Sequence, residues 1–239
     1  ELLEEALNPI DGSNPPKTIA VFGLPGIGRR SLVKNVAKDL FSLHKCVEIE
    51  VEDGESLYSL CAKLADIIEP YSCQEELRDL VSEINKLTET EVLLRVVNNI
   101  KSIMAANELP IFVDSGGLTI ENGCLSGFIN KIIESIEQVQ DAYICLVLSR
   151  RISRDNDVGV ESVPIEQLSA RASSQLISKL SIRSTIKLSP ENIRELTDYI
   201  NGYPPAAYFA IKQASLYSVD ALMSDKRKLT QFSQKRFIT

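Results

Sequence analysis

The chain has 239 residues, and its 26 lysines and arginines against 33 aspartates and glutamates give it a formal net charge of −7. Such an acidic chain lacks the broad positive field that attracts nucleic acid, so we do not expect nucleic-acid binding as its main activity. Apolar residues make up 44% of the sequence and charged residues 25%, which excludes a disordered, collagen-like or coiled-coil chain.

Two further properties of the sequence concern location and metal chemistry. The acidic start Glu1–Glu5 is unlike a signal peptide, and no apolar run is long enough to span a bilayer, so we expect a cytoplasmic protein without membrane contact. Because the start also lacks a methionine, we expect a fragment of a longer protein. The five cysteines are widely spaced and form no CxxC pair, which disfavours a disulfide framework and a zinc site.

The first two thirds of the chain alternate predicted strands with predicted helices. After an N-terminal tail, Thr18–Phe22 is a short, apolar, β-branched run typical of a buried parallel strand. A glycine-rich loop follows it, and then comes a helical pattern of apolar residues. This alternation predicts a five-stranded parallel sheet with right-handed crossovers. The other expected strands are 46–51, 109–114, 142–148 and 160–164, and the later expected helices are 57–67, 73–86, 89–106 and 122–138.

Beyond residue 164 the sequence carries only helical signals. Serines and prolines occupy the positions of helix caps and first turns there. The expected helices begin near Ser169, Ser189, Pro204 and Lys226. We therefore expect an α/β domain over residues 1–163 and a small all-helical domain over residues 164–239.

The glycine-rich loop carries the clearest functional signal. Between a buried strand and a helix, Gly23-Leu-Pro-Gly-Ile-Gly28 aims backbone N–H groups at one point, where the helix dipole also favours an anion. The full phosphate-binding pattern, GxxxxGK[ST], adds a lysine for the phosphates and a hydroxyl for magnesium. In this sequence Arg29 takes the lysine position and Arg30 the hydroxyl position. Strand context and glycine spacing still favour a P-loop NTPase fold over a structural turn.

The segment Gly23-Leu-Pro-Gly-Ile-Gly-Arg-Arg-Ser-Leu32 resembles a degenerate form of the phosphate loop of the NB-ARC (AP-ATPase) branch of STAND NTPases. These proteins are the nucleotide-operated switches of plant resistance proteins, apoptosome-type adaptors and related bacterial proteins. Ile111–Asp114 resembles their Walker B strand, Leu146–Arg150 their sensor strand, and Gly202–Pro204 the glycine-x-proline motif of their helical lid. The resemblance implies a P-loop NTPase sheet over 1–163, followed by a helical lid.

The resemblance also implies ligands, partners and residue roles. Arg150 would sense the terminal phosphate of ADP or ATP, and Pro204 would pack near the adenine under the closing lid. The implied partners are other copies of the chain upon activation, with a TIR-like effector domain and a sensor domain in the longer protein. The implied nucleotide-binding residues are Gly23, Pro25, Gly26, Ile27, Gly28, Arg29, Arg30, Ser31, Leu32, Arg150 and Pro204.

The sequence departs from the family pattern where magnesium and catalysis are concerned. Arg30 has donors only and cannot replace the hydroxyl that ligates the metal, whereas Ser31 offers a hydroxyl about 100° further around the helix. Asp114 is the Walker B acid, but Ser115 stands where a second acid often positions the attacking water. Ser31 and Asp114 are thus the candidate metal ligands, and we expect them to hold Mg²⁺ poorly. Hydrolysis should fall by several powers of ten.

The sequence leaves three functional interpretations open. In the first, favoured by Arg30 and Ser115, the chain is a nucleotide-binding signalling switch of an NLR-like immune or defence protein, with little or no hydrolysis. In the second it is a slow ATPase in which Arg29 and Arg30 replace lysine and magnesium. In the third it is a scaffold that binds no nucleotide. A nucleic-acid-binding role for the basic segment 226–236 is disfavoured, because a solvated helix explains those charges.

Overall fold

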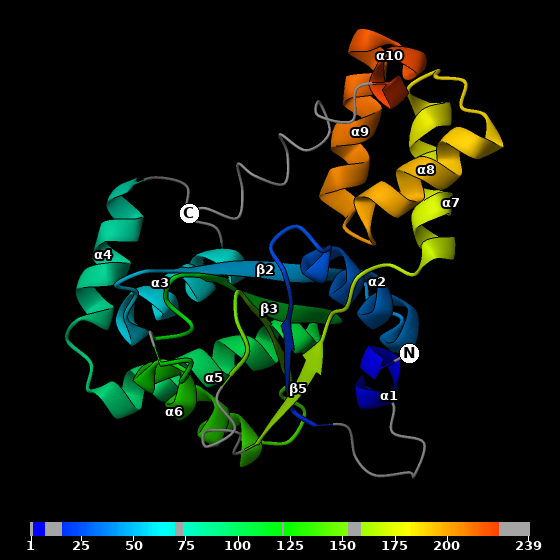
Figure 1. The fold of residues 1–239 in the computed structure, drawn as a ribbon. Helices are drawn as coiled ribbons and strands as arrows, with labels where there is room; N and C mark the ends of the chain where they lie inside the picture. Colours follow the sequence, from blue (N-terminus) through cyan, green and yellow to red (C-terminus); the bar gives the residue numbers. More distant parts are fainter. Residues whose placement is uncertain (1, 8–15, 70–73, 121, 153–158, 225–239) are drawn as a thin grey trace. The chain divides into compact units, whose positions relative to one another are not determined.

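In the computed structural model, the parts that can be described are residues 2–7, 16–69, 74–120, 122–152 and 159–224 (Figure 1). The chain divides into two compact units. The first consists of Glu1–Leu24 and Arg29–Ile165, and the second of Pro25–Gly28 and Glu166–Thr239. The chain leaves the first unit at Ile165, and the division into domains expected at residue 163 stays a prediction. In the described part of the chain, no helix is both long and apolar enough to cross a lipid bilayer.

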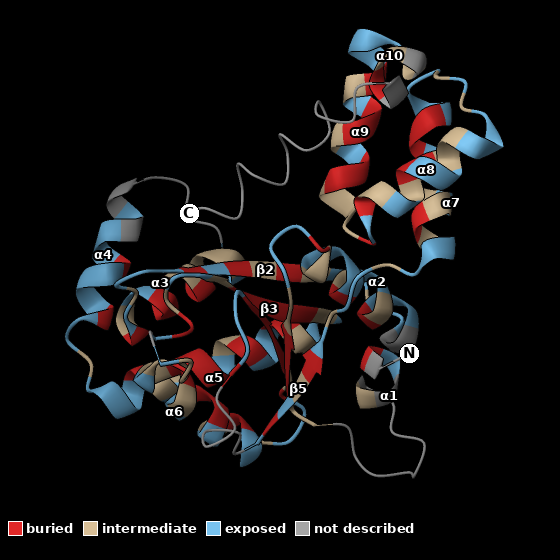
Figure 2. Ribbon diagram, viewed as in Figure 1, coloured by how far each residue is buried: buried red, intermediate tan, exposed pale blue. Residues whose placement is uncertain are grey.

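A five-stranded parallel sheet forms the centre of the first unit, as the sequence predicted. The strands are β1 (Thr18–Phe22), β2 (Lys45–Glu52), β3 (Glu108–Ser115), β4 (Ile144–Leu148) and β5 (Val160–Pro164). Their order across the sheet is β2-β3-β4-β1-β5. The central strand β4 is buried along its whole length. The edge strand β2, labelled in Figure 2, alternates buried and accessible residues in its second half. This difference follows from position, because a central strand has protein on both faces and both edges.

Helices cover both faces of the sheet. They are α1 (Leu2–Leu7), α2 (Arg29–Phe41), α3 (Leu57–Ile68), α4 (Gln74–Ile84), α5 (Glu89–Ala105) and α6 (Gly127–Glu137). Because successive side chains of a strand point to opposite faces, Ala20 and Phe112 pack with α3, α4, α5 and α6. Their neighbours Ile19, Val21 and Ile111 pack with α1 and α2 on the other face.

Two local predictions in this unit differ from the structure. The N-terminal tail contains α1, which forms because Leu3 is buried against the core beside α2. The helix expected from residue 122 begins only at Gly127. Gly123 has a φ of 79°, which does not fit a right-handed helix, and the Cys124 N–H donates to the side chain of Asn122 in a turn.

The second unit contains four described helices around its own apolar core. They are α7 (Ala170–Arg183), α8 (Pro190–Ile200), α9 (Pro204–Tyr217) and α10 (Val219–Ser224). The predicted N-caps are confirmed, since the side chains of Ser169 and Ser189 accept hydrogen bonds from the first turns of α7 and α8. The short helix α10 was not predicted. The helix expected over residues 226–236 lies outside the described residues.

Candidate functional site

The glycine-rich loop keeps the backbone conformation that its glycines allow. Gly26 has a φ of 79° and Gly28 a φ of 102°, in the region where only glycine is unstrained. Ile27 between them is buried, and the helix α2 begins at the next residue, Arg29. The first turn of α2 contains no acidic residue, so its positive dipole end is not neutralised by its own side chains.

Arg29 connects the loop to the carboxyl end of β4. Its guanidinium donates a hydrogen bond to the backbone carbonyl of Leu148, the last residue of β4. The side chain is half-buried, and burial lowers the pKa of Arg29; the charge of Asp114 opposes this shift, and that of Arg30 adds to it. The guanidinium therefore joins the predicted phosphate loop to the sensor strand, and the charge of Asp114 on the Walker B-like strand acts on it.

Asp114 lies at the end of β3, and its carboxylate is occupied by hydrogen bonds. Oδ1 accepts from the N–H groups of Gly116 at 3.1 Å and Leu118 at 3.2 Å. Oδ2 accepts from the hydroxyl of Thr119 at 3.0 Å, and from the N–H and hydroxyl of Ser149 at 3.2 and 2.6 Å. A carboxylate has about four lone-pair sites. These five donors therefore fill the positions that a metal ion would need.

The pKa of Asp114 reflects this environment. Burial raises it, but the hydrogen bonds from Ser149, Thr119 and Gly116 outweigh burial and leave the pKa lowered. The group is thus held as a carboxylate. The sequence pointed to Asp114 but not to Ser149 or Thr119. Ser149 follows β4, and its contact with Asp114 depends on β3 and β4 being neighbours in the sheet.

Arg30 is directed toward the edge strand β2. Its Nη1 lies 2.9 Å from Oε1 of Glu50 and 3.7 Å from Oε2 of Glu48. One turn further along α2, the ammonium of Lys34 lies 2.5 Å from Oε1 of Glu48. The sequence did not point to either glutamate, because nothing in the chain spacing shows which strand this face of α2 meets. A phosphate would have to compete with Glu50 for the guanidinium of Arg30.

The second candidate metal ligand, Ser31, is exposed on α2. Its hydroxyl forms no hydrogen bond with another described residue, and Leu32 beside it is 38% exposed. Among the described residues, no group of three or more histidines, cysteines, aspartates or glutamates could hold a metal ion. With Arg30 in the hydroxyl position, Ser31 exposed and the oxygens of Asp114 occupied by five donors, these residues do not fit a magnesium ion.

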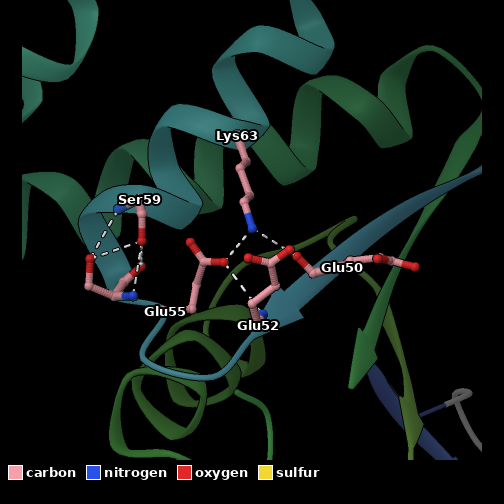
Figure 3. Close-up of polar contacts among 6 residues, drawn as sticks. Glu50, Glu52, Glu55, Ser59 and Lys63 are labelled. Atoms are coloured by element: carbon pink, nitrogen blue, oxygen red, sulfur yellow. Dashed lines mark hydrogen bonds and ion pairs between the residues drawn. The ribbon is translucent and has the colours of Figure 1, made fainter. Parts of the chain in front are cut away.

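A partly buried ion pair between Lys63 and Glu55 fixes the loop between β2 and α3 (Figure 3). Figure 3 shows the ammonium of Lys63 between the carboxylate of Glu55, with which it pairs, and the carbonyl of Glu50, which accepts at 3.1 Å. The Glu55 side chain is 5% exposed. Burial raises its pKa, but the hydrogen bonds from Lys63 and Ser59 outweigh burial and leave the pKa lowered. This arrangement fixes the carboxyl end of β2, next to Arg30.

The end of β2 is also tied to the loop that surrounds Asp114. Glu52 and Gly116 form an isolated antiparallel bridge, and the N–H of Gly117 donates to the carbonyl of Val51 at 3.2 Å. A Cβ at Gly117 would lie 2.0 Å from the carbonyl oxygen of Glu52, so this close approach requires glycine. The hydrogen-bond donors around Asp114 are therefore held in place from two strands.

Within the second unit, the tip of the glycine-rich loop contacts the start of α9. The Tyr203 hydroxyl donates to the carbonyl of Pro25 at 2.6 Å. A Cβ at Gly26 would lie 2.6 Å from Cγ of Pro205. The predicted adenine contact, Pro204, is the first residue of α9, between these two residues. Sequence analysis singled out Pro204 but missed the contacts of Tyr203 and Pro205.

The sensor-like arginine lies just after β4. Arg150 is exposed, as is its neighbour Arg151, whose guanidinium sits 5.7 Å from the ring centre of Phe22. This contact places Arg151 beside the end of β1. The role of Arg150 toward a phosphate remains a prediction.

Comparison of the sequence with protein-family models gives no match, and comparison with curated protein sequences gives none either. Comparison with solved structures does give matches. The structure of the FIGL-1 AAA domain in complex with ADP has a TM-score of 0.54 and 12% identity over 90% of this chain. A STAND protein with a tetratricopeptide repeat sensor from Pyrococcus horikoshii has a TM-score of 0.53 and 13% identity over 82% of this chain.

A Walker-type ATPase of Pyrococcus abyssi is similar to the same degree, with a TM-score of 0.55 and 13% identity over 95% of this chain. The chain spans 66% of the FIGL-1 structure, 28% of the STAND protein and 68% of the Pyrococcus abyssi ATPase. At these identities the likeness concerns the fold. Together with the strand order and the loop between β1 and α2, it shows that this chain shares the fold of these P-loop ATPase structures.

Proposed function

We propose that this chain is a nucleotide-binding switch domain that binds ADP or ATP without magnesium and hydrolyses ATP at most at a trace rate. The observation that carries the proposal is the occupied carboxylate of Asp114, with five hydrogen-bond donors on its two oxygens. Nucleotide binding is supported by the positive φ of Gly26 and Gly28 and by the fold, since one structural neighbour contains ADP.

This chain lacks free groups of the kind that hold the metal ion in other P-loop sites. In P-loop NTPases a Ser or Thr after the lysine and the Walker B Asp hold Mg²⁺. Here Arg30 replaces the hydroxyl and pairs with Glu50, while the oxygens of Asp114 are already used. Mg²⁺ demands near-ideal octahedral oxygen coordination. Any metal would therefore have to break several hydrogen bonds in order to bind.

Arg29 supplies the counter-charge for the phosphates in this proposal. It occupies the lysine position, is half-buried, and has donors beyond the one that the Leu148 carbonyl accepts. Hydrogen bonds from a guanidinium to phosphate oxygens are charge-assisted and often bidentate. The contact with Leu148 orients the guanidinium next to the loop whose backbone would bind the phosphates.

The same arrangement disfavours hydrolysis. Ser115, which follows Asp114, is exposed and is not a general base at neutral pH. Asp114 is held as a carboxylate by donors that fill its oxygens, so it is poorly placed to orient an attacking water. Phosphoryl transfer depends on positioning and charge neutralisation, and this site lacks parts of both. A slow ATPase that uses Arg29 and Arg30 is less well supported, because Arg30 is engaged by Glu50.

The finer role that we propose is that of a signalling switch in an NLR-like immune or defence protein. This role rests on the order of the four NB-ARC-like motifs, and the STAND protein among the structural neighbours is consistent with it. In this role the nucleotide state of the chain controls self-association. Effector and sensor domains, of the TIR-like and repeat types, belong to the longer protein.

The proposal is tested by releasing any bound nucleotide from the purified protein with acid and then measuring steady-state ATP hydrolysis with magnesium. We expect ADP or ATP in the released fraction and turnover at the level of the buffer blank. Turnover of about one per second, typical of slow enzymes, that disappears in Asp114→Asn would contradict the proposal. Absence of nucleotide and of any binding would favour the scaffold interpretation.

A further inference from the structure

A cavity of about 300 Å³ lies in the first unit, away from the loop described above. It sits on the face of the sheet that α1 and α2 cover, at the amino ends of β1, β3 and β4. The side chains that form most of its wall are apolar: Ile19, Val33, Ala37, Leu109, Ile144 and Cys145.

The cavity is separate from the candidate nucleotide site. It is lined by Lys17 and Ile19 at the start of β1, whereas the glycine-rich loop follows the other end of that strand, after Phe22. A five-residue strand is about 17 Å long. The two features therefore lie at opposite ends of the sheet, and a ligand in the cavity does not contact the phosphate loop.

The size of the cavity exceeds what packing normally leaves. Protein interiors are close-packed and contain few voids larger than a water molecule. An engineered apolar cavity of about 150 Å³ stays dry and binds benzene. The present cavity has twice that volume and falls at the lower end of the range of about 300–1,000 Å³ found for ligand pockets. Water needs two to four polar partners, whereas most of these walls are apolar.

The polar groups at the cavity indicate what its ligand would carry. The ammonium of Lys17 donates to three carbonyls at the end of α6, so its three protons are used. The amide of Asn107 donates to the carbonyl of Ser42 at 3.1 Å. The hydroxyl of Tyr143 has no hydrogen bond to any described residue. The hydroxyl of Tyr143 is therefore the lining group best able to form a hydrogen bond with a ligand. Because the three protons of Lys17 are used, the described lining residues present no charged group that is available to a ligand.

We propose that this cavity binds a neutral, largely apolar small molecule of about the size of a bicyclic aromatic, with one polar group that bonds to the hydroxyl of Tyr143. The thiol of Cys145 suits such a ligand, because burial raises its pKa and keeps the thiol uncharged. The ligand would contact Val33 and Ala37 on α2, the helix that begins at Arg29. The cavity is thus a second site, independent of whether nucleotide binds.

The test uses naphthalene and 2-naphthol as probes and the full chain in buffer without nucleotide. We expect saturable one-to-one binding of both probes by calorimetry, and a rise in the unfolding temperature. Ala37→Leu places three additional carbon atoms in the cavity and should weaken the binding of both probes at least tenfold. Ala105→Leu, at the exposed end of α5, is the matched control and should bind like the unmodified chain. Tyr143→Phe should weaken 2-naphthol about three- to tenfold and leave naphthalene unchanged.

The position of the probe gives a readout that does not depend on the variants. Nuclear Overhauser effects from naphthalene protons should reach the methyl groups of Val33 and Ile144 in the unmodified chain. A flat titration would show that the chain itself fills this space and would overturn the proposal. So would equal binding by Ala37→Leu, or Overhauser contacts confined to the second unit.

Discussion

Ser149 donates two hydrogen bonds to one oxygen of Asp114, from its N–H at 3.2 Å and from its hydroxyl at 2.6 Å. Asp114 is the second-last residue of β3 and Ser149 follows the neighbouring strand β4, so this pair of bonds joins the carboxyl ends of both strands. It also accounts for the lowered pKa of Asp114 more than any other hydrogen-bond partner does. The Walker B-like acid Asp114 therefore stabilises the fold through these hydrogen bonds, and this role needs no metal ion.

The first prediction concerns the stability that Asp114 contributes. Asp114→Ala leaves the donors of Thr119, Ser149 and the 116–118 backbone without their acceptor, and each lost charge-assisted bond costs about 1.5–3 kcal/mol before solvent compensates. Because Asp114 is half-buried, we expect a net loss of about 2–4 kcal/mol in the free energy of unfolding, measured with urea. Ser115→Ala, one residue on and exposed, is the control and should change it by less than about 0.5 kcal/mol. Equal stability of the two variants would contradict this role.

The second prediction is a pH dependence with a definite sign. Since the pKa of Asp114 is lowered in the folded chain, its stabilisation is complete above the unfolded pKa of about 3.9 and is lost as the pH falls through the folded value. Unfolding measured between about pH 5 and pH 2 should therefore depend less steeply on pH in Asp114→Asn. Some slope should remain, because the pKa of Glu55 is lowered as well. Parallel curves for both proteins would count against the assignment.

The third prediction separates the two arginines of the loop. Arg29 is half-buried at the carbonyl of Leu148, so Arg29→Ala should weaken ADP binding about ten- to hundredfold, the loss of one charge-assisted contact. Arg30 is paired with Glu50 at the surface, where such pairs contribute at most about 1 kcal/mol. Arg30→Ala should therefore change the affinity by less than about threefold.

Arg78→Ala, an exposed change on α4, controls for the loss of one positive charge. The measurement is the fluorescence of a labelled ADP. If Arg30→Ala weakens ADP binding more than Arg29→Ala does, the ion pair of Arg30 with Glu50 breaks when nucleotide binds. Arg30 would then be the main counter-charge for the phosphates, which contradicts the prediction.

The fourth prediction uses two glycines with similar backbone angles. Gly26 and Gly54 have φ of 79° and 75°, but a Cβ at Gly26 would meet Pro205 at 2.6 Å, whereas a Cβ at Gly54 meets no heavy atom within 4 Å. Gly54→Ala should cost about 1–2 kcal/mol, the ordinary penalty for a positive φ. Gly26→Ala should cost at least about 1 kcal/mol more in thermal unfolding. Equal losses would mean that Pro205 moves aside freely.

Much of the fold could be predicted, because its signals are local. The apolar runs of β1 and β4, the loop glycines and the caps at Ser169 and Ser189 each determine structure through their own neighbours in sequence. The late start of α6 was missed because the turn at Gly123 is too short to change the apolar pattern around it.

The sequence singled out residues of a candidate site, whose role in binding stays a prediction, but it did not show their contacts. Arg29, Arg30 and Asp114 were identified, but the partners of Arg30 depend on which strand lies beside α2, and the sequence does not specify that. The pairing of Asp114 with Ser149 follows from β3 and β4 being neighbours in the sheet. Strand order is a property of the whole fold, so these contacts required the structure.

The central claim is that nucleotide binds to the loop without a metal, and calorimetric titration of ADP with and without EDTA tests it most directly. With Asp114 occupied and Arg30 in place of the hydroxyl, we predict micromolar affinity, about −8 kcal/mol, that changes by less than about threefold between excess Mg²⁺ and excess EDTA. Loss of binding in EDTA would contradict the claim, because it would show that magnesium is held by groups which this structure commits elsewhere.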